Sequence, residues 1–491
     1  MITMTLREVA AVTGGRLAAD GPEVVVDGEV VIDSRQAGPG TLVAAFVGST
    51  ADGHEHVPGA LAAGAAGALV TRPDVAEAAG ADPARLVVVD DVAAALGRLA
   101  RHVLASLRGD GDGPRVVAVT GSVGKTTTKD LLAHLLAPLG DLIAPPGSFN
   151  NEIGLPLTVL RARPSTATLV LEMGADHVGN LEYLTSVAPP DVAVVLAVGR
   201  AHLGEFGGIE NVARAKSELV AGLRPTGTAV LNADDHRVAA MAPLAPGPVR
   251  TFGRGDADVV ATDVVLDDAG RAAFTLTSPA GAAHVRLALV GEHHVHNALA
   301  AATVALELGL TPAQVADLLA AAPAASPHRM AVTDRADGVR VVDDSYNANP
   351  DSVRAGLRAL ATLGAGRRKV AVLGEMLELG ADSAAEHDAA GADAVAAGAD
   401  VVLAVGAGTA PLAAGARRAA GPAAGSTGSA GSDGPVVEVV EVPDVDAAEA
   451  DLRDRLRPGD VVLLKGSNGS GIWRLADALL TGTATGGRMP S

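Results

Sequence analysis

The sequence contains no cysteine among its 491 residues. This absence excludes disulfide bonds, thiolate nucleophiles and zinc sites built on cysteine. Aromatic residues are scarce as well, with 5 Phe, 2 Tyr and 1 Trp, so the hydrophobic cores must consist mainly of Val, Leu and Ala. No window holds the roughly 18 consecutive apolar residues of a membrane-spanning helix, and the first residues lack the apolar segment of a secretory signal. We therefore expect a cytoplasmic protein without a membrane span.

Basic residues are also fewer than acidic ones, since the chain has 38 Lys and Arg residues and 57 Asp and Glu residues. The resulting net charge of −19 leaves little basic surface for the phosphates of a nucleic acid, which argues against nucleic acid as the main partner. A chain of this length is expected to form about three domains, each large enough for its own hydrophobic core.

The clearest feature that the sequence does contain is a phosphate-binding loop. Residues 116–119 predict a strand and residues 130–136 predict a helix, and a glycine-rich turn joins them. In such a loop the backbone N–H groups converge on a phosphate, Lys125 reaches the terminal phosphates, and the Thr126 hydroxyl suits Mg²⁺. The residues predicted to bind the nucleotide here are Gly121, Ser122, Val123, Gly124, Lys125, Thr126 and Thr127. The pattern indicates a nucleoside triphosphate with Mg²⁺.

The loop is of a short form, because Val119 stands where the common motif has its first glycine. The pattern therefore differs from that of ordinary GTPases and ATPases. The alternative is a Gly/Ser turn between a strand and a helix, with Lys125 as a surface residue. We favour the phosphate loop because strand, turn and helix follow one another in the order that the motif requires.

Two further side chains follow predicted strands in the same part of the chain. Glu172 ends one apolar run, and His202 follows another. Open α/β sheets bind ligands beyond the carboxyl ends of their strands, so both side chains are predicted to face the nucleotide phosphates. A buried core carboxylate is the alternative for Glu172, and a core or surface residue is the alternative for His202. Three histidines within residues 293–296 lack further zinc ligands and are interpreted as polar residues at a helix start.

Strands and helices alternate along the whole chain, which predicts an α/β protein of three domains. Residues 1–108 form the first domain, and a glycine- and acid-rich linker precedes the phosphate-loop strand. Residues 109–325 are predicted to form a central domain with a parallel sheet and a small antiparallel layer near residues 250–290. Residues 326–491 repeat strand and helix in turn, as in a doubly wound domain, with a flexible surface loop expected at 421–434.

Short motifs spread over nearly the whole chain resemble those of the ATP-dependent Mur ligases, which build peptidoglycan precursors. The matching segments are residues 120–126, 149–151, 171–175, 201–202, 215–218, 232–234, 297–300, 343–350, 374–376 and 465–467, in the order of the family. The resemblance implies three α/β domains: an N-terminal UDP-sugar substrate-binding domain, a central ATP-binding domain and a C-terminal Rossmann-like ligase domain. It also implies an amide ligation that uses ATP and Mg²⁺ and passes through an acyl phosphate.

The resemblance further implies a role for each matching residue. Besides the loop, the implied ATP-binding residues are Asn297, Arg329 and Asp344. The implied metal ligands are Thr126, Glu172, His202 and Lys216, and the implied catalytic residues are Lys125, Lys216, His202 and Glu172. The implied substrate-binding residues are Ser34, Arg35, Asn150, Asn151, Tyr346, Asn347, Asn349 and Lys465. Lys216 fits a metal site only as a carbamate, because an ammonium has no lone pair for Mg²⁺.

Within the family, the chain looks most like members that add a preformed dipeptide. It has no Asp-Asn-Pro-Arg run, which members that add a free diamino acid are expected to carry, and residues 344–350 stand in the corresponding region. The implied partners are small molecules, a UDP-N-acetylmuramoyl tripeptide and D-alanyl-D-alanine, and we expect a monomer. The alternatives are the amino-acid-adding ligase of the preceding step, a folylpolyglutamate-synthetase-like ligase and a non-catalytic nucleotide-binding scaffold. His294 and Asn468 depart from the family pattern, which often has Asn and Arg there.

Overall fold

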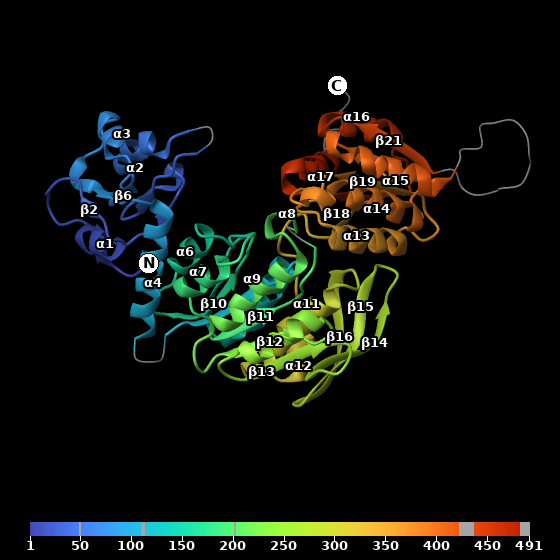
Figure 1. The fold of residues 1–491 in the computed structure, drawn as a ribbon, viewed down its shortest axis with the longest axis horizontal. Helices are drawn as coiled ribbons and strands as arrows, with labels where there is room; N and C mark the ends of the chain where they lie inside the picture. Colours follow the sequence, from blue (N-terminus) through green and yellow to red (C-terminus); the bar gives the residue numbers. More distant parts are fainter. Residues whose placement is uncertain (49–50, 110–112, 201–202, 422–436, 482–491) are drawn as a thin grey trace, which may run out of the picture.

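The computed structural model describes residues 1–48, 51–109, 113–200, 203–421 and 437–481. Its elements form three α/β bodies that follow one another along the chain (Figure 1). The N-terminal body, in blue, and the C-terminal body, in orange and red, stand on opposite sides of the green central body. In the described residues no helix is both long and apolar enough to cross a membrane.

The N-terminal body is a five-stranded sheet with strand order β2-β7-β6-β5-β4, beside a two-stranded ribbon of β1 and β3. Its first helix begins where Thr5 and Glu8 form a capping box and ends at Gly14, whose φ of 69° suits glycine. The elements are β1 (Met4–Thr5), α1 (Leu6–Thr13), β2 (Arg16–Leu17), β3 (Val25–Val26), β4 (Val30–Val31), β5 (Leu42–Ala44), α2 (Val57–Ala62), β6 (Gly67–Val70), α3 (Pro73–Ala78), β7 (Leu86–Val88) and α4 (Val92–Arg108).

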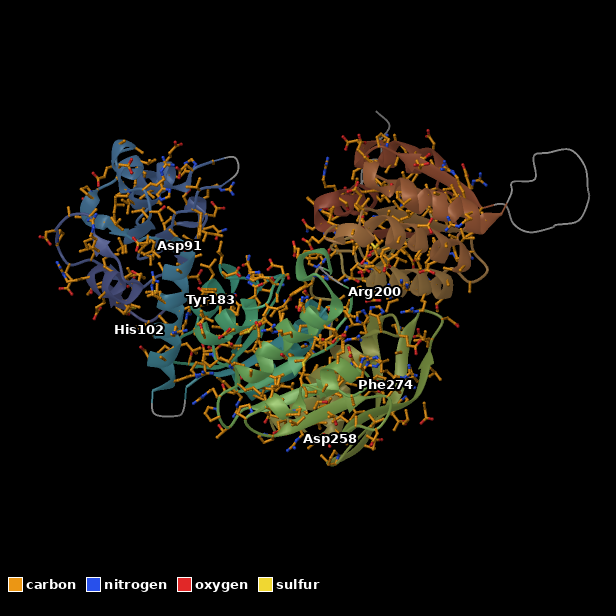
Figure 2. The ribbon with its side chains drawn as sticks, in the orientation of Figure 1. Asp91, His102, Tyr183, Arg200, Asp258 and Phe274 are labelled. Atoms are coloured by element: carbon orange, nitrogen blue, oxygen red, sulfur yellow. The ribbon has the colours of Figure 1, made fainter. Side chains whose placement is uncertain are left out.

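Helix α4 joins the N-terminal body to the central body. Its residues Leu96, Leu99 and Val103 recur at helical spacing and are buried in one core with side chains of two central helices. These helices are α6 (Gly154–Val159) and α7 (Asn180–Val187). Tyr183 on α7 lies against Gly97 of α4, where a larger residue would collide with its hydroxyl group (Figure 2). The two bodies therefore contact each other through α4.

The central body contains a nine-stranded sheet with the order β16-β15-β14-β13-β12-β11-β8-β10-β9. Alternate residues of β8 face opposite sides, because Val116 and Ala118 pack with α7 and α9, whereas Val117 and Val119 pack with α5 and α11. The remaining elements are β8 (Arg115–Thr120), α5 (Lys125–Leu136), β9 (Asp141–Ile143), β10 (Thr166–Glu172), β11 (Val192–Val195), α8 (Leu203–Phe206), α9 (Ile209–Ala221), β12 (Thr228–Asn232), α10 (His236–Ala239), β13 (Val249–Gly253), β14 (Val259–Leu266), β15 (Arg271–Ser278), β16 (Gly281–Val290), α11 (His294–Glu307) and α12 (Pro312–Ala321).

The structure confirms the antiparallel strands that the sequence predicted near residues 250–290. Strand β13 pairs in parallel with β14, with Phe252 opposite Val259, and β14, β15 and β16 continue as antiparallel neighbours. Because the hydrogen-bonded ladder passes from β13 to β14, these strands extend the same sheet. Helix α12 packs on β15 and β16 and covers this extension.

The C-terminal body is a six-stranded sheet with the order β17-β18-β22-β19-β20-β21, and helices α13, α14 and α15 pack in one core while α16 and α17 pack in the other. Helices on both faces and parallel pairing from β18 to β21 confirm the doubly wound fold. The elements are β17 (Ala331–Asp334), β18 (Arg340–Asp343), α13 (Pro350–Leu363), β19 (Lys369–Gly374), α14 (Ser383–Ala396), β20 (Val401–Val405), α15 (Ala410–Ala420), β21 (Glu438–Val442), α16 (Val445–Arg455), β22 (Val461–Lys465) and α17 (Ile472–Thr481).

Edge strand β17 was not predicted from the sequence. It pairs antiparallel with β18, and none of its four residues is fully buried, so its apolar pattern is weak. Nearly all of the loop predicted at residues 421–434 lies outside the described residues.

Candidate active site

A cavity of about 550 Å³ lies between the central and C-terminal bodies. Parallel strands β8 and β10 end beside it, because their register places Glu172 opposite Val119. The predicted site residues that line it are Ser122, Val123, Gly124, Lys125, Thr126, Thr127, Asn150, Asn151, Glu172, Lys216, Asn297, Arg329, Asp344, Tyr346, Asn347, Asn349 and Lys465. The fold thus brings most of the predicted site residues together.

Three predicted residues of the described chain do not line this cavity. Gly121 is the first residue of the loop after β8, and its carbonyl oxygen accepts from Lys125 Nζ. Ser34 and Arg35 belong to a short 3-10 turn of the N-terminal body, where the Arg35 guanidinium pairs with Asp33 at 2.7 Å. His202 lies outside the described residues. The cavity therefore holds residues predicted for nucleotide and metal, whereas the residues predicted for the UDP-sugar lie elsewhere.

The phosphate loop connects β8 to α5, and Gly124 makes the turn into the helix. Its φ of 83° lies in the left-handed region, and an added Cβ would collide with the amide oxygen of Asn297. Lys125 Nζ donates to the carbonyl oxygen of Gly121 at 2.9 Å. Desolvation lowers the pKa of Lys125, and the charge of Glu172 opposes this shift. The ammonium group is thus held beside a helix N-terminus, which attracts phosphate.

Glu172 is buried at the end of β10 and accepts hydrogen bonds on both carboxylate oxygens. Thr126 Oγ1 donates to Oε2 at 2.9 Å, and Ser148 Oγ and Asn150 Nδ2 each donate to Oε1 at 2.8 Å. These donors satisfy a carboxylate that is only 1% exposed. Glu172 is therefore both a satisfied buried residue and a residue that faces the cavity.

The donor atoms in this part of the cavity suit a magnesium ion bound together with a nucleotide. The hydroxyl of Thr126 and the carboxylate of Glu172 are hard oxygen ligands that already touch each other. No group of three or more His, Asp or Glu side chains in the described chain could hold a metal ion alone. Mg²⁺ is commonly bound by one or two carboxylates and completed by substrate phosphates, so this small donor set fits it.

Lys216 projects from α9 into the same cavity and is only 3% exposed. Burial, with a smaller contribution from the charge of Lys125, lowers its pKa to about 7. A large share of these amines is therefore neutral near pH 7 and carries a free lone pair. A buried amine with so low a pKa is unusual on a helix and makes Lys216 a candidate functional residue.

The C-terminal wall of the cavity is organised by two cationic side chains. Arg329 lies over the ring of Tyr346, 4.1 Å from its centroid, and donates to the Thr126 hydroxyl at 3.1 Å. The buried Lys465 Nζ donates to Asp344 Oδ2 at 2.6 Å and to the Asn347 carbonyl oxygen at 2.8 Å. Arg329 thus links the two walls, and Lys465 holds the loop that follows β18.

Two predicted substrate-binding asparagines also begin helices. The Asn151 amide oxygen accepts from Gly154 N at 2.9 Å at the start of α6. The Asn349 amide oxygen accepts from Ser352 N at 2.9 Å and forms a capping box at the start of α13. Their positions at the cavity are therefore explained in part by local hydrogen bonds to the backbone at helix starts, with Asn349 as the N-cap of α13.

Two histidines at the cavity were assigned no ligand role from the sequence. The rings of His293 and His294 lie 4.0 Å apart at the start of α11, and His294 Nδ1 lies 3.1 Å from Asn297 Nδ2. Burial lowers the pKa of His293 to about 4 and that of His294 well below its usual value, so both rings are neutral at pH 7. The helical spacing of His294 and Asn297 was the signal that could have placed them on one face.

Comparison with protein families gives three matches along the chain. Residues 28–103 match the Mur ligase family, catalytic domain; residues 119–305 match the Mur ligase middle domain; residues 328–468 match the Mur ligase, glutamate ligase domain. Each of the three bodies contains one of these segments.

Individual proteins are similar over most of the chain. The UDP-N-acetylmuramoyl-tripeptide--D-alanyl-D-alanine ligase of Mycobacterium tuberculosis is 47% identical over 100% of both chains. The enzyme of that name from Escherichia coli is 37% identical over 83% of this chain and 86% of its own. A crystal structure of MurF from Acinetobacter baumannii superposes with a TM-score of 0.83 at 30% identity, covering 97% of this chain and 99% of that one. MurF ligase from Thermotoga maritima, in complex with ADP, gives a TM-score of 0.76 at 28% identity, covering 93% and 98%.

Proposed function

Because this chain belongs to the Mur ligase family, we propose that it joins D-alanyl-D-alanine to a UDP-N-acetylmuramoyl tripeptide at the expense of ATP. The products are the UDP-muramoyl pentapeptide, ADP and phosphate. The observation that carries this proposal is the cavity, in which Lys125, Thr126 and Glu172 of the phosphate loop and its sheet face Arg329 and Tyr346 of the C-terminal body. One cavity thus combines a phosphate site with a second wall that can position an acceptor.

The chemistry of amide formation explains why these residues are needed. A carboxylate and an amine do not condense spontaneously in water, so the carboxylate of the tripeptide first takes the γ-phosphoryl group of ATP. We assign Lys125 and Arg329 to neutralise the charge on that group. Thr126 and Glu172 would hold Mg²⁺, which supplies further neutralisation when bound. The amine of D-alanyl-D-alanine then attacks the acyl phosphate and expels phosphate.

We propose that Lys216 acts as a carbamate on the metal side of the cavity. Its low pKa supplies the neutral amine that reacts with CO₂, and the product carries the oxygen atoms that Mg²⁺ prefers. His202 is proposed as a further ligand. The neutral adenosine would lie near Asn297 and Asp344, which line the cavity.

We also propose the domain limits 1–108, 109–325 and 326–491, and a UDP-sugar site at Ser34 and Arg35. The first limit lies at the end of α4, and the last lies directly before Ser326, whose Oγ donates to Asp130 of α5 at 2.6 Å. One chain supplies both walls of the cavity, which supports action as a monomer. Its use of ATP supports a cytoplasmic location.

The test of the reaction is the substrate requirement for ADP release. We expect turnover only when the UDP-muramoyl tripeptide and D-alanyl-D-alanine are both present, with a weak response to D-alanine alone. The peptide bond of the dipeptide offers a hydrogen-bond donor and an acceptor. A single amino acid lacks both and would leave polar groups of a buried site without partners. Mass spectrometry should identify the pentapeptide product. ADP release with a UDP-muramoyl dipeptide and free diaminopimelate or lysine would assign the chain to the preceding step instead.

Ligand binding is expected to compact the protein. Ser34 and Arg35 belong to the N-terminal body and do not line the cavity, so the UDP-substrate and ATP must be brought together by movement of the bodies. Closure would also protect the acyl phosphate from water. Small-angle scattering should give a smaller radius of gyration with an ATP analogue and UDP-substrate than without them, at an unchanged monomer mass. An identical radius in both states would contradict closure.

A further inference from the structure

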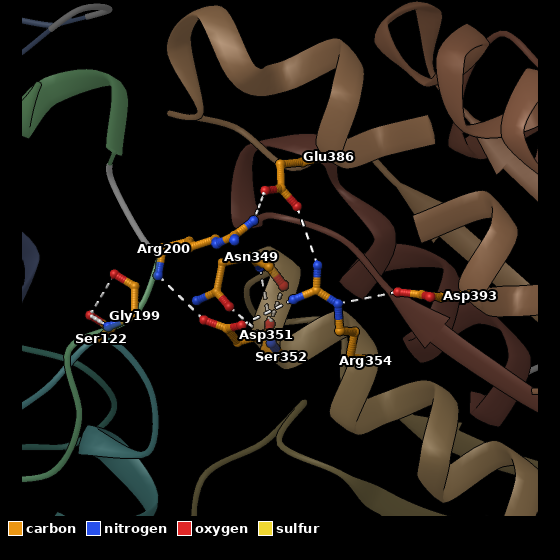
Figure 3. Close-up of polar contacts among 9 residues, drawn as sticks. All are labelled: Ser122, Gly199, Arg200, Asn349, Asp351, Ser352, Arg354, Glu386 and Asp393. Atoms are coloured by element: carbon orange, nitrogen blue, oxygen red, sulfur yellow. Dashed lines mark hydrogen bonds and ion pairs between the residues drawn. The ribbon is translucent and has the colours of Figure 1, made fainter. Parts of the chain in front are cut away.

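A ring of four charged residues connects the central body to the C-terminal body at the edge of the cavity, which one of them, Asp351, also lines. Its members are Arg200, which follows β11, Asp351 and Arg354 on α13, and Glu386 on α14 (Figure 3). The backbone N–H of Arg200 donates to Asp351 Oδ2 at 3.3 Å, and its guanidinium pairs with Glu386 Oε1. Arg354 donates to the other oxygens of the same two carboxylates, at 3.1 and 3.4 Å. We call this group the interdomain ring.

Glu386 is buried, so the ion pairs of the interdomain ring compensate the cost of removing its carboxylate from water. This side chain is 10% exposed, and a buried carboxylate is costly unless cations and donors satisfy it. Arg354 belongs to the same body as Glu386, whereas Arg200 comes from the central body. Figure 2 shows Arg200 between the central and C-terminal bodies. Movement of the bodies away from each other would leave Glu386 with one of its two cations.

The ring is directly connected to the phosphate loop. Gly199 N donates to Ser122 Oγ at 2.8 Å, and the Ser122 hydroxyl in turn donates to Gly199 O at 3.3 Å. A Cβ added to Gly199 would lie 2.7 Å from Asp351 Oδ2, so the backbone and the carboxylate are in close contact. The first turn of α13 therefore rests on the segment that holds Ser122 of the loop.

A second contact fixes the same pair of surfaces. Gly204 N, in α8, donates to Glu378 O at 3.3 Å, and an added Cβ on Gly204 would be 2.7 Å from Gly380 N. The segment from Gly380 leads into α14, which carries Glu386. The two sides of the interdomain ring are thus packed closely on either side of Arg200.

We infer that Arg200 is a positioning residue for phosphoryl transfer, because it fastens the C-terminal wall of the cavity to the phosphate loop. The inference rests on the proposed function. Arg200 does not line the cavity, so it acts through Ser122 on one side and through α13 on the other. A displacement of about 1 Å between reacting groups can lower a rate by roughly 100-fold, so loss of this connection should be visible in turnover.

The kinetic test compares Arg200→Ala, Glu386→Gln and the double variant with Arg418→Ala. Arg418 pairs with Asp388, which lies on α14 as Glu386 does. Both partners of this ion pair belong to the C-terminal body, which makes Arg418→Ala a matched control. We expect kcat for ADP release to fall roughly 10-fold to 100-fold in Arg200→Ala, with KM for the UDP-substrate nearly unchanged. The double variant should be no slower than the slower single variant, because the two substitutions remove the same ion pair between Arg200 and Glu386. Arg200→Lys should recover part of the rate, and Arg418→Ala should equal the wild type.

A distance measurement tests the same inference without turnover. Since the chain has no cysteine, Arg214→Cys on α9 and Asp454→Cys on α16 would carry two unique spin labels on exposed positions of the two bodies. In the ligand-free protein, Arg200→Ala should broaden the distribution of distances between them, and Arg418→Ala should not. Unchanged kcat and an unchanged distribution in Arg200→Ala would overturn the inference. If the wild type releases no ADP while Arg200→Ala still broadens the distances, the proposed function would be contradicted and the connection through the interdomain ring would be supported.

Discussion

Replacing Lys125 with alanine is expected to abolish ADP formation, with a loss in kcat of roughly 10³-fold or more. The ammonium group is held against the loop by its hydrogen bond to Gly121, and Lys125 lines the cavity in which we propose that the terminal phosphates bind. Alanine carries no positive charge. The negative charge that develops on the transferring phosphoryl group would therefore be left without its nearest cation. Initial rates of ADP release with saturating substrates measure the loss.

The fold should survive this substitution. Desolvation already disfavours the charged form of Lys125, so removing it relieves a cost rather than breaking a core contact. Thermal unfolding should therefore give a Tm equal to or above that of the wild type. Lys369→Ala, a lysine at the start of β19 in the C-terminal body, is the control and should turn over normally. A folded Lys125→Ala variant with full turnover would remove the phosphate loop from the mechanism.

Lys216→Ala should lose about as much activity as Lys125→Ala. Small carboxylates such as formate or acetate should restore part of it. The reason is that the proposed carbamate supplies oxygen ligands that alanine lacks and that a free carboxylate can replace. Arg214→Ala, an exposed cation two residues earlier on α9, is the matched control and should be as active as the wild type. Full activity of Lys216→Ala would contradict the carbamate, and an ordinary helix lysine would be the remaining interpretation.

The pH dependence of Lys216 provides a second measurement of the same proposal. Its pKa falls from 10.5 to about 7, so below pH 7 the amine is protonated and cannot react with CO₂. Protein depleted of CO₂ and then given bicarbonate should regain activity more fully at pH 8 than at pH 6. Between about pH 7 and 10.5 the unfolded state binds more protons than the folded state, so the CO₂-depleted protein should become more stable as pH rises. Lys216→Ala should lack that contribution.

Local patterns in the chain were sufficient for the α/β class, the three bodies and the phosphate loop. A strand, a glycine turn and a helix are neighbours in sequence, and the left-handed φ of Gly124 is a property of that residue and its immediate surroundings. The position of Glu172 at a strand end also follows from the sequence, because parallel strands present their carboxyl ends at one edge. The proposed roles of Ser34, Arg35 and His202 depend on family resemblance and stay predictions.

Contacts between distant segments were decided only by the tertiary structure. The pairing of β13 with β14, which joins the antiparallel strands to the parallel sheet, depends on register between strands and not on the composition of either. The same holds for the burial that lowers the pKa of Lys216 and that of His294, since a pKa responds to the groups that packing places around it. Arg200 and Glu386 lie in different bodies, and neither sequence neighbourhood indicates the other. Their ion pair exists because the packing of the two sheets brings a loop after β11 against α13 and α14.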